Sequence, residues 1–374
     1  MAYGYDAVVI GGGIIGCSVG WRLAQTGRTV ALLERGRVGG EASSAAGGIF
    51  IPEAESGLSP DLLRFWDLSN QLYPAFVEEV RAATGEAFEF RVNGRLVVGF
   101  SEEDVARLRQ DFARQAPAGI RAEWLSGADA RAAEPSLSPG VQAAIFFPDH
   151  GLVDNPRLTH ALGSAVRRAG GDLFENRPVT GLRVQGGRVT GVETPNGEVA
   201  SPIVVNCAGS WSGLVDPRAR QPVRPAKGQM LAVDRGAMPL NHLVAGPGGS
   251  AVPRADGRTL IGATVDDVGF DKDVIAGAIS GLFQRTARIL PALEQARFLD
   301  AWAGLRPMCP DHQPLIGADP ELGGLYWATG HFTMGILSAP ATARAIAELI
   351  DLGRTALPIA GFGAQRFAVP ASAR

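Results

Sequence analysis

The segment that most constrains the fold lies near the N-terminus, where an apolar strand runs directly into a glycine loop. Residues 5–10 form an apolar, β-branched run typical of a buried parallel strand, and a helical pattern extends over residues 14–25. Between them, the spacing of Gly11, Gly13 and Gly16 matches a dinucleotide-binding loop. The first glycine permits a tight turn, the second a close approach to a pyrophosphate, and the third close packing of helix on strand. The sequence therefore predicts a βα unit whose helix N-terminus binds phosphate.

The residues after this helix narrow the choice of ligand. A second predicted strand, residues 29–33, ends in Glu34, whose carboxylate suits the hydroxyls of an adenosine ribose and repels a 2′-phosphate. This motif fits FAD and NAD equally well. The loop at residues 39–48 consists mainly of small residues and has two interpretations: a second cradle around a pyrophosphate and the edge of a flavin ring, or a flexible surface loop.

The middle of the chain carries further signals of a cofactor-binding fold. A helical pattern at residues 155–169 precedes a hairpin signal with strands at 179–184 and 188–194, and a short apolar strand follows at 203–206. That strand leads into a small-residue turn that resembles the return loop of FAD proteins of the glutathione-reductase type. Cys207 beside this turn is interpreted as a small buried side chain and not a nucleophile, because no histidine is near it in sequence.

Length and charge set the remaining limits. A chain of 374 residues exceeds the roughly 250–300 residues that one core supports, so we expect two lobes. The formal charge of −3 provides no basic field and argues against nucleic-acid binding. The three cysteines are far apart in sequence and match neither a disulfide framework nor a metal site. Because the sequence shows no signal peptide and no membrane-spanning run, we expect a cytoplasmic protein without a membrane partner.

Several later motifs carry a resemblance that covers nearly the whole chain. They are Lys227-Gly228-Gln229, Val252-Pro253-Arg254, Thr329-Gly330-His331-Phe332 and residues 260–264, 302–307 and 335–342. Together with the glycine loop, Glu34 and the loop at residues 40–48, these motifs resemble the D-amino-acid oxidase superfamily of FAD enzymes. Within that superfamily the chain is most similar to the glycine oxidases of the thiamine pathway.

The resemblance implies an α/β fold in two interleaved parts. One is a Rossmann-like FAD-binding domain of the glutathione-reductase type, and the other is an α+β substrate domain with a mainly antiparallel sheet. We expect the FAD-binding domain to use residues 1–85, 149–222 and 303–365, the substrate domain to use residues 86–148 and 223–302, and residues 366–374 to form a tail. Helical patterns at residues 60–84, 102–115 and 271–290 fit this plan. Similar oxidases assemble into dimers or tetramers, so a homo-oligomer is expected.

The resemblance also assigns roles to site residues, and it assigns no metal ligand. Arg306 is expected to bind the substrate carboxylate, because a guanidinium grips a carboxylate through two parallel hydrogen bonds. The alternative for Arg306 is an ion pair with an internal carboxylate. The helix that begins near Gly335 is expected to direct its N-terminal dipole at the flavin while packing its apolar face against the core. The positions expected to contact FAD are Gly11, Gly13, Ile14, Ile15, Gly16, Glu34, Arg35, Ser43, Ser44, Ala46, Gly47, Val179, Ala208, Gly209, Trp211, Gly304, His331, Phe332, Met334, Gly335 and Ile336.

Three further expectations concern the reaction at the flavin. In the similar sarcosine oxidases a cysteine tethers FAD, but Gly304 stands at about that place here and Cys309 is not aligned with it, so we expect non-covalent FAD. Lys227 is a candidate for assisting the reaction with molecular oxygen, with a structural role as the alternative. His331 is not expected to act as a general base, because hydride loss from a neutral amine requires no proton abstraction from carbon.

Departures from the glycine oxidase pattern fall on the substrate-facing positions. Ser250 stands near the place of a usual tyrosine, Val265 replaces a longer methionine, and Thr333-Met334 replace an Arg-Asn pair. These changes predict a larger and more apolar pocket that keeps one anchor, Arg306.

We therefore expect the enzyme to oxidise the glycine unit of an N-substituted glycine, such as an N-carboxymethyl amino acid of secondary metabolism. The products would be glyoxylate, the free amine and hydrogen peroxide. Four alternatives stay open: oxidation of glycine or sarcosine, oxidation of a D-amino acid, an FAD dehydrogenase that passes electrons to a carrier, and a non-catalytic FAD-binding protein.

Overall fold

A six-stranded sheet forms the first of two large layers in the computed structural model, which describes residues 4–54, 57–219 and 221–367. The strand order is β19-β20-β13-β1-β2-β9, and all neighbours are parallel except β19 and β20. The strands are β1 (Ala7–Ile10), β2 (Val30–Leu33), β9 (Asp172–Phe174), β13 (Val204–Asn206), β19 (Leu315–Ala318) and β20 (Leu325–Thr329). The predicted βα unit is therefore confirmed, and its strand lies at the centre of the sheet.

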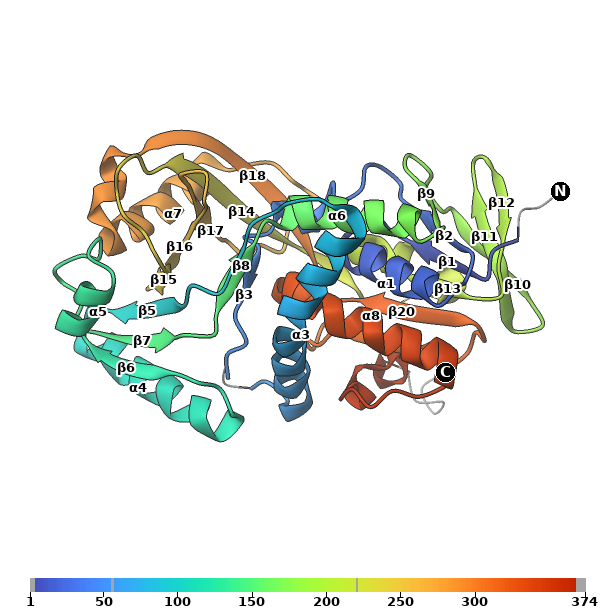
Figure 1. Ribbon diagram of the computed structural model, residues 1–374, viewed down its shortest axis with the longest axis horizontal. Coiled ribbons are helices and arrows are strands. Elements are labelled where there is room, and N and C mark those ends of the chain that lie inside the picture. Colours follow the sequence, from blue (N-terminus) through green and yellow to red (C-terminus); the bar gives the residue numbers. More distant parts are fainter. Residues whose placement is uncertain (1–3, 55–56, 220, 368–374) are drawn as a thin grey trace.

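Four helices accompany this sheet because their apolar faces share one core with it. They are α1 (Ile14–Gln25), α3 (Pro60–Thr84), α6 (Asn155–Arg168) and α8 (Gly335–Leu352). Helix α3 begins where Ser59 accepts a hydrogen bond from the Leu62 N–H and Pro60 takes the first helical position, which lacks a backbone donor. The helical patterns at 60–84 and 155–169 are confirmed; α3 packs beside α8, and α6 packs beside α1 (Figure 1).

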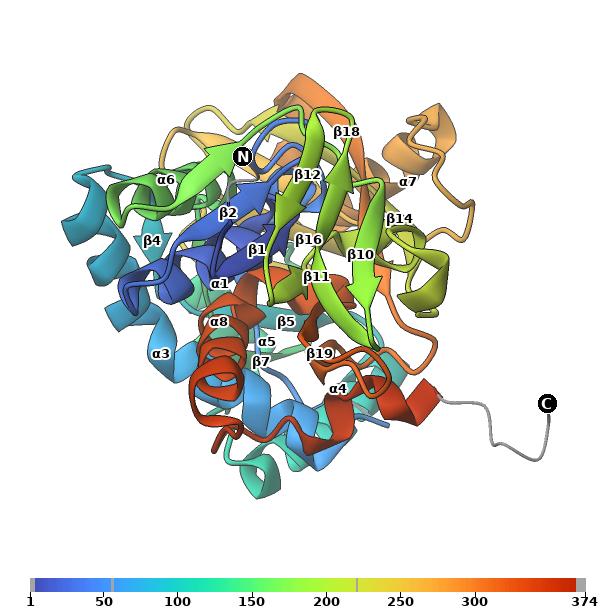
Figure 2. The ribbon, with the colours of Figure 1, turned by 90° about the vertical axis from the view of Figure 1, so that its right-hand side faces the viewer.

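A small antiparallel sheet extends from the far end of this layer. It contains β10 (Gly181–Gln185), β11 (Arg188–Thr194) and β12 (Gly197–Ala200), and it faces the viewer in Figure 2. The predicted hairpin is thus the first part of a three-stranded unit. Val179 precedes β10 instead of lying within a strand.

The second large layer is an eight-stranded sheet with the order β18-β14-β17-β16-β15-β5-β7-β6. Only β15 and β5 are parallel neighbours, so the expected mainly antiparallel sheet is confirmed. Its strands are β5 (Arg95–Gly99), β6 (Glu123–Ser126), β7 (Ala143–Phe147), β14 (Arg224–Asp234), β15 (Leu243–Gly246), β16 (Gly249–Pro253), β17 (Arg258–Gly262) and β18 (Arg297–Met308). Figure 1 shows this sheet, with α4 (Glu102–Gln115), α5 (Gly127–Ala133) and α7 (Ala276–Ile289), on the side opposite the parallel sheet.

Helix α7 begins at Ala276, five residues after the expected start at residue 271. The preceding residues are used for tertiary contacts instead of helical ones. Asp271 pairs with Lys227, and the Ile275 N–H donates to Gln229 Oε1 at 2.7 Å. These contacts hold the segment extended beside β14.

The chain crosses between the two layers several times, as the interleaved plan requires. A third sheet joins β3 (Ile49–Phe50), β8 (Gly151–Val153) and β4 (Phe90–Arg91), which come from segments assigned to different domains. The expected boundary at residue 303 falls inside β18, whose whole length to Met308 pairs with β14. The domain boundaries therefore stay predictions. Of the expected tail, residues 368–374 lie outside the described part, whereas Arg366 donates to Asp311 Oδ2 at 2.8 Å and is held in place.

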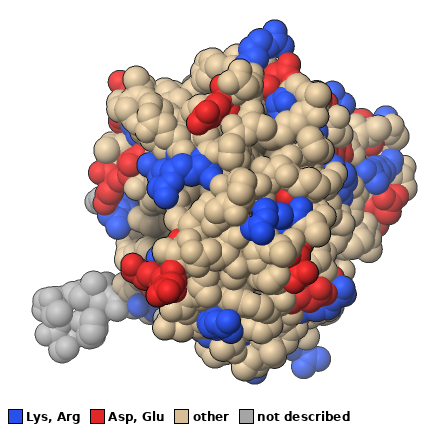
Figure 3. Space-filling view, turned by 90° about the vertical axis from the view of Figure 1, so that its left-hand side faces the viewer, with Lys and Arg blue, Asp and Glu red and all other residues tan. Residues whose placement is uncertain are grey.

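On the face shown in Figure 3, acidic and basic side chains are interspersed and neither sign forms a broad field. This distribution agrees with the small net charge. Among the described helices, none is both long and apolar enough to cross a bilayer.

Candidate active site

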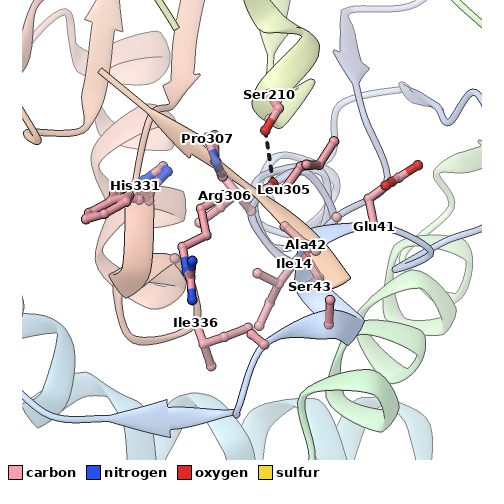
Figure 4. A pocket seen from close by; sticks show the side chains of 18 of the residues that line it. Ile14, Glu41, Ala42, Ser43, Ser210, Leu305, Arg306, Pro307, His331 and Ile336 are labelled. Carbon is pink, nitrogen blue, oxygen red and sulfur yellow. Dashed lines mark hydrogen bonds between the residues drawn. The ribbon is translucent and has the colours of Figure 1, made fainter. Parts of the chain in front are cut away.

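A cavity of about 650 Å³ lies between the parallel sheet and the eight-stranded sheet. Its walls come from the glycine loop, the end of β2, the loop around α2 (Ala42–Ala45), the turn after β13, the N-terminus of α8, and strands of the eight-stranded sheet. A volume of this size suits a sizeable organic ligand. Figure 4 shows the part of the cavity around Arg306.

The glycine loop has the geometry that its sequence predicts. Gly11 has a φ of +102°, a conformation that favours glycine, and it makes the turn from β1 into α1. At Gly16 a β-carbon would lie 1.9 Å from the Gly11 carbonyl oxygen, so only glycine allows the helix to lie this close to the strand. Gly11, Gly13, Ile14 and Ile15 line the cavity, whereas Gly16 packs behind the loop.

Glu34 lies at the end of β2 and is only 8 % exposed. Its carboxylate accepts hydrogen bonds from the Gly12 N–H at 2.6 Å and the Gly36 N–H at 2.7 Å, which fixes its direction along the cavity wall. Beside it, the Arg35 guanidinium lies 3.5 Å from the centroid of the Trp211 ring and pairs with Glu41. The acid and the stacked pair together form one end of the cavity.

The small-residue loop at residues 39–48 is a fixed cradle, not a loose surface loop. Ser43 Oγ accepts a hydrogen bond from the Ile14 N–H at 2.9 Å, which joins this loop to the N-terminus of α1. Asn155 Nδ2 donates to the carbonyls of Ser43 and Ala46 at 2.6 and 3.0 Å. Arg254 donates to the Gly47 carbonyl at 2.8 Å. Asn155 and Arg254 were not assigned to the site, although Arg254 belongs to the Val252-Pro253-Arg254 motif, which was the available signal.

Arg306 projects from β18 into the cavity, and its guanidinium points toward Ile336 (Figure 4). Nη1 donates to the Thr264 carbonyl at 2.9 Å, and a β-carbon at position 228 would come within 2.3 Å of the guanidinium nitrogens. Gly228 therefore provides the flat floor on which this side chain rests. No ion pair joins Arg306 to any carboxylate in the described ranges, so the alternative of a structural ion pair is not observed. Burial lowers the pKa of Arg306 and the nearby Asp266 opposes that effect, but the guanidinium stays charged.

The N-terminus of α8 faces the cavity opposite Arg306. Met334, Gly335 and Ile336 line the wall, and the helix begins at Gly335 with no side-chain cap, so its first amides and its dipole face the ligand space. His331 is buried, and its Nε2 lies 3.0 Å from Thr342 Oγ1. Burial lowers the pKa of His331 to about 3, so this ring is neutral near neutral pH.

The four residues that differ from the glycine oxidase pattern and are expected to enlarge the pocket lie at different depths in the cavity. Ser250 lines the interior and donates to the Gly262 carbonyl, and Met334 is 7 % exposed. Val265 is 60 % exposed and Thr333 is also exposed, so these two residues lie at the mouth of the cavity. The loss of bulk therefore acts inside the pocket at Ser250 and at its opening at Val265.

The contacts of Lys227 favour the structural alternative. Its side chain is 2 % exposed and does not line the cavity; Nζ donates to Asp271 Oδ2 at 2.8 Å and to the Asp273 carbonyl at 3.0 Å.

Cys207 lines the cavity but is buried, and burial raises the pKa of its thiol well above its ordinary value. The thiol is therefore protonated and is no nucleophile.

At Gly304 a β-carbon would lie 2.4 Å from the Ala45 β-carbon, which leaves no room for a cysteine side chain. Cys309 is buried outside the cavity wall. Neither position presents a thiol to the cavity.

Nearly all sequence-assigned cofactor positions lie on this one cavity; Gly16 and Ser44 do not line it. The sequence analysis did not assign Arg95, Met230, Ile49 and Ile51, which also line it. Within the described part of the chain, no group of three or more acidic, histidine or cysteine side chains could hold a metal ion.

Comparisons with known proteins give a consistent result. Residues 6–349 match the model of the DAO family, described as FAD dependent oxidoreductase. The chain is 34 % identical to a glycine oxidase of Geobacillus kaustophilus over 372 residues, which cover 98 % of both chains. It superposes on the crystal structure of glycine oxidase from that organism with a TM-score of 0.93 at 33 % identity, covering 98 % of this chain and 100 % of the other. An L-proline dehydrogenase from P. horikoshii matches with a TM-score of 0.87 at 26 % identity over 98 % of both chains.

Proposed function

Because the chain belongs to the DAO family of FAD-dependent oxidoreductases and is of the glycine oxidase type, we propose that it oxidises the glycine unit of N-substituted glycines. The proposed reaction converts the secondary amine, oxygen and water into glyoxylate, a primary amine and hydrogen peroxide. The proposal rests on Arg306, a partly buried cation that lines a largely apolar cavity and forms no salt bridge among the described residues.

The residues that line the cavity suit FAD. Glu34 is held by two backbone amides at the end of β2, where it can accept from ribose hydroxyls. The amides at the start of α1 and the fixed loop with Ser43 border one space, as a pyrophosphate requires. When bound, FAD supplies the acceptor for the hydride that leaves the substrate carbon.

Arg306 positions the substrate. Its free guanidinium edge can take a carboxylate through two hydrogen bonds, while Thr264 and Gly228 fix the direction of the side chain. A glycine-type carboxylate held there has its α-carbon one bond away, so the anchor determines where the C–H bond points. This orientation is the main contribution of the residue to the rate.

The proposed reaction needs no general base, and the positions of the charged groups on the cavity wall agree with this. The wall carboxylates are Glu34 and Glu41, which lie at the Arg35–Trp211 end, and His331 is held neutral by burial. The cavity wall near Arg306 includes the apolar side chains of Met230 and Ile336, and the nearby Asp266 does not line the cavity. An amine that enters as the free base retains its lone pair there, and loss of hydride from carbon requires no proton acceptor.

Two observations support an N-substituent. The cavity continues past Arg306 along β16 and β15, where Ser250, Val252 and Leu243 line it, and glycine alone would leave this extension empty. In addition, a structurally similar protein is a dehydrogenase of L-proline, whose nitrogen is a secondary amine. Ordinary glycine or sarcosine oxidation is the simpler alternative.

The deciding experiment measures kcat/KM for glycine, sarcosine and N-alkylglycines of rising chain length. A methylene buried in a fitting pocket contributes about 0.8 kcal/mol, or roughly fourfold in kcat/KM. Values that stay flat or fall along the series would reject the N-substituent.

A dehydrogenase that passes electrons to a carrier is the second candidate, since a structurally similar protein is named an L-proline dehydrogenase and not an oxidase. Purified protein turning over substrate in air should form one peroxide per glyoxylate. Glyoxylate formed only after addition of an artificial electron acceptor would favour the dehydrogenase.

Non-covalent attachment of FAD is proposed from the lack of a thiol on the cavity wall at Gly304 and from the position of Cys309. Acid precipitation should release the yellow chromophore into the supernatant. Colour that stays in the pellet would contradict this proposal.

A further inference from the structure

A second arginine lines the same cavity as Arg306 but lies on β5, five strands away from β18 in the eight-stranded sheet. Arg95 is the first residue of β5, and its side chain is 14 % exposed. Its neighbour on strand β15 is the apolar Leu243, which also lines the cavity. Arg95 is therefore the charged residue of an otherwise apolar end of the cavity.

Strand register shows that both arginines lie on one face of the sheet. Arg306 pairs directly with Ala226 on β14, so the two side chains share a face. Side chains alternate along a strand, which places Met230 on this face as well. Met230 in turn pairs with Gly262 on β17, and Leu260, two residues before it, keeps the same face.

The remaining strands continue the same face to Arg95. Leu260 pairs with Val252 on β16, and the register of β16 with β15 places Leu243 on the side of Val252. Leu243 pairs with Arg95 across the parallel step from β15 to β5. Met230, Leu243, Val252 and Leu260 also belong to one buried cluster, which agrees with a shared face. The result is an apolar floor with a guanidinium at each end.

The separation of these two cations sets the size of a ligand that reaches both. The Arg306 guanidinium contacts the carbonyl of Thr264, just beyond β17, and β5 lies three strands from β17. The backbone at Arg95 is therefore three strand spacings across the sheet and about four residues along the strand from the Arg306 guanidinium. After subtraction of the reach of the Arg95 side chain, the distance between the two guanidinium groups is on the order of 10–20 Å. That gap corresponds to roughly three to six extended residues.

The guanidinium of Arg95 has one carboxylate partner, Glu53, and forms no hydrogen bond with other residues in the described ranges. His150 Nδ1 lies 3.7 Å from Glu53 Oε1, and burial lowers the pKa of His150 to about 3, so this ring brings no charge to the cluster. A guanidinium has five donors, and one carboxylate cannot satisfy them all. Because Arg95 lines the cavity, its remaining donors are available to a ligand there.

We propose that Arg95 is a specificity-determining residue that binds a second carboxylate, carried at the far end of the substrate's N-substituent. The inference rests on the proposed function and defines its substrate class: an elongated secondary amine with a glycine-type carboxylate at one end, an apolar middle, and an acidic group at the other end. Glu53 holds Arg95 in place and, as a like charge to the ligand, limits how tightly the second carboxylate binds.

The first experiment is a binding titration that does not depend on turnover. The wild-type holoenzyme is titrated with linear α,ω-dicarboxylates of increasing length and with monocarboxylates of the same lengths, and binding is followed by the change in flavin absorbance. Beyond a threshold length the dicarboxylate should bind about tenfold or more tightly than its monocarboxylate partner, as for a charge-assisted hydrogen bond. Equal affinities at every length would overturn the proposal.

Three variants assign that preference to Arg95. Arg95→Met should remove the preference for the dicarboxylate, and Glu53→Gln, which removes the competing charge and keeps the shape, should increase it. Arg91→Met is the matched control, because Arg91 also pairs with a glutamate but does not line the cavity. A purely structural ion pair predicts that both Arg95→Met and Glu53→Gln weaken the two ligand classes equally. If Arg95→Met does not fold, the wild-type titration and Glu53→Gln decide.

Turnover separates this inference from the proposed function. If N-alkylglycines are poor substrates, the proposed function fails whatever the titration shows. If they are good substrates but N-(ω-carboxyalkyl)glycines of every length have no higher kcat/KM, the proposed function stands and the role of Arg95 is rejected.

Discussion

Replacing Arg306 with methionine tests the substrate anchor most directly. Methionine keeps the apolar stem that packs over Gly228 and removes only the guanidinium. The folded state loses one hydrogen bond, to the Thr264 carbonyl, so the cost in unfolding free energy should be about 1 kcal/mol. A large effect on catalysis without a large effect on stability is therefore expected.

The magnitude follows from the contact that the guanidinium can make. A hydrogen-bonded contact to a charged group contributes about 1.5–3 kcal/mol, which corresponds to a loss of about 10- to 150-fold in kcat/KM. The loss should be confined to carboxylated substrates. The carboxamide of the same N-alkylglycine cannot form the ion pair, so its kcat/KM should change little in Arg306→Met.

The assay compares kcat/KM for the acid and its amide in the wild type and in the variant, and the ratio of the two losses isolates the carboxylate contact. Arg224→Met is the control, because Arg224 lies on the neighbouring strand β14 and pairs with Asp267 outside the cavity. Equal losses for acid and amide, or no loss for either, would refute the assignment of Arg306 as the carboxylate anchor.

Three further predictions test individual features of the structure. Gly16→Ala should destabilise the fold by several kcal/mol and reduce bound flavin, whereas Gly277→Ala, where a β-carbon meets nothing within 4 Å, should raise the melting temperature slightly; similar behaviour of the two would contradict the packing argument. Lys227→Met should cost about 1–3 kcal/mol in urea unfolding but leave the stopped-flow rate of flavin reoxidation by oxygen unchanged, and a slowed reoxidation would restore a role with oxygen. Burial lowers the pKa of both His150 and His331 to about 3. Below pH 6.5 the unfolded chain therefore binds more protons than the folded protein does. The free energy of unfolding should then fall by about 1.4 kcal/mol per histidine for each pH unit below 6.5. Urea unfolding at pH 7 and pH 5 checks this, and a slope that is not reduced in His150→Asn would count against that histidine.

The cofactor half of the site could be predicted from sequence because its determinants are local. The turn at Gly11, the close packing at Gly16 and the acid at the end of β2 all lie within one βαβ unit of about thirty residues, so spacing alone defines their geometry. Even the assignment of Arg306 depended on a local motif. The predicted start of α7 was five residues too early, because contacts of Asp271 and Ile275 with β14 override local helix propensity.

The cradle around Ser43 shows what a local pattern leaves open. Composition allowed either a fixed loop or a flexible one, and the difference depends on Asn155 and Arg254, which are more than a hundred residues away in sequence. Lys227 shows the same limit, since a buried lysine in a family motif is equally compatible with chemistry and with an ion pair. The partner at Asp271 decides between them, and that partner becomes visible only when β14 and the segment before α7 lie together.

The substrate half of the site depends almost wholly on register between distant strands. Alternation within β5 shows that Arg95 and Val97 share a face, but not whether that face meets the cavity or the outer helices. The answer comes from the parallel pairing of β5 with β15, a contact across nearly 150 residues, and from four further antiparallel steps to β18. A slip of one residue at any of these steps would turn Arg95 to the opposite side of the sheet and leave a cavity with one anchor. The length of the substrate is therefore encoded in sheet register, and no single motif along the chain records it.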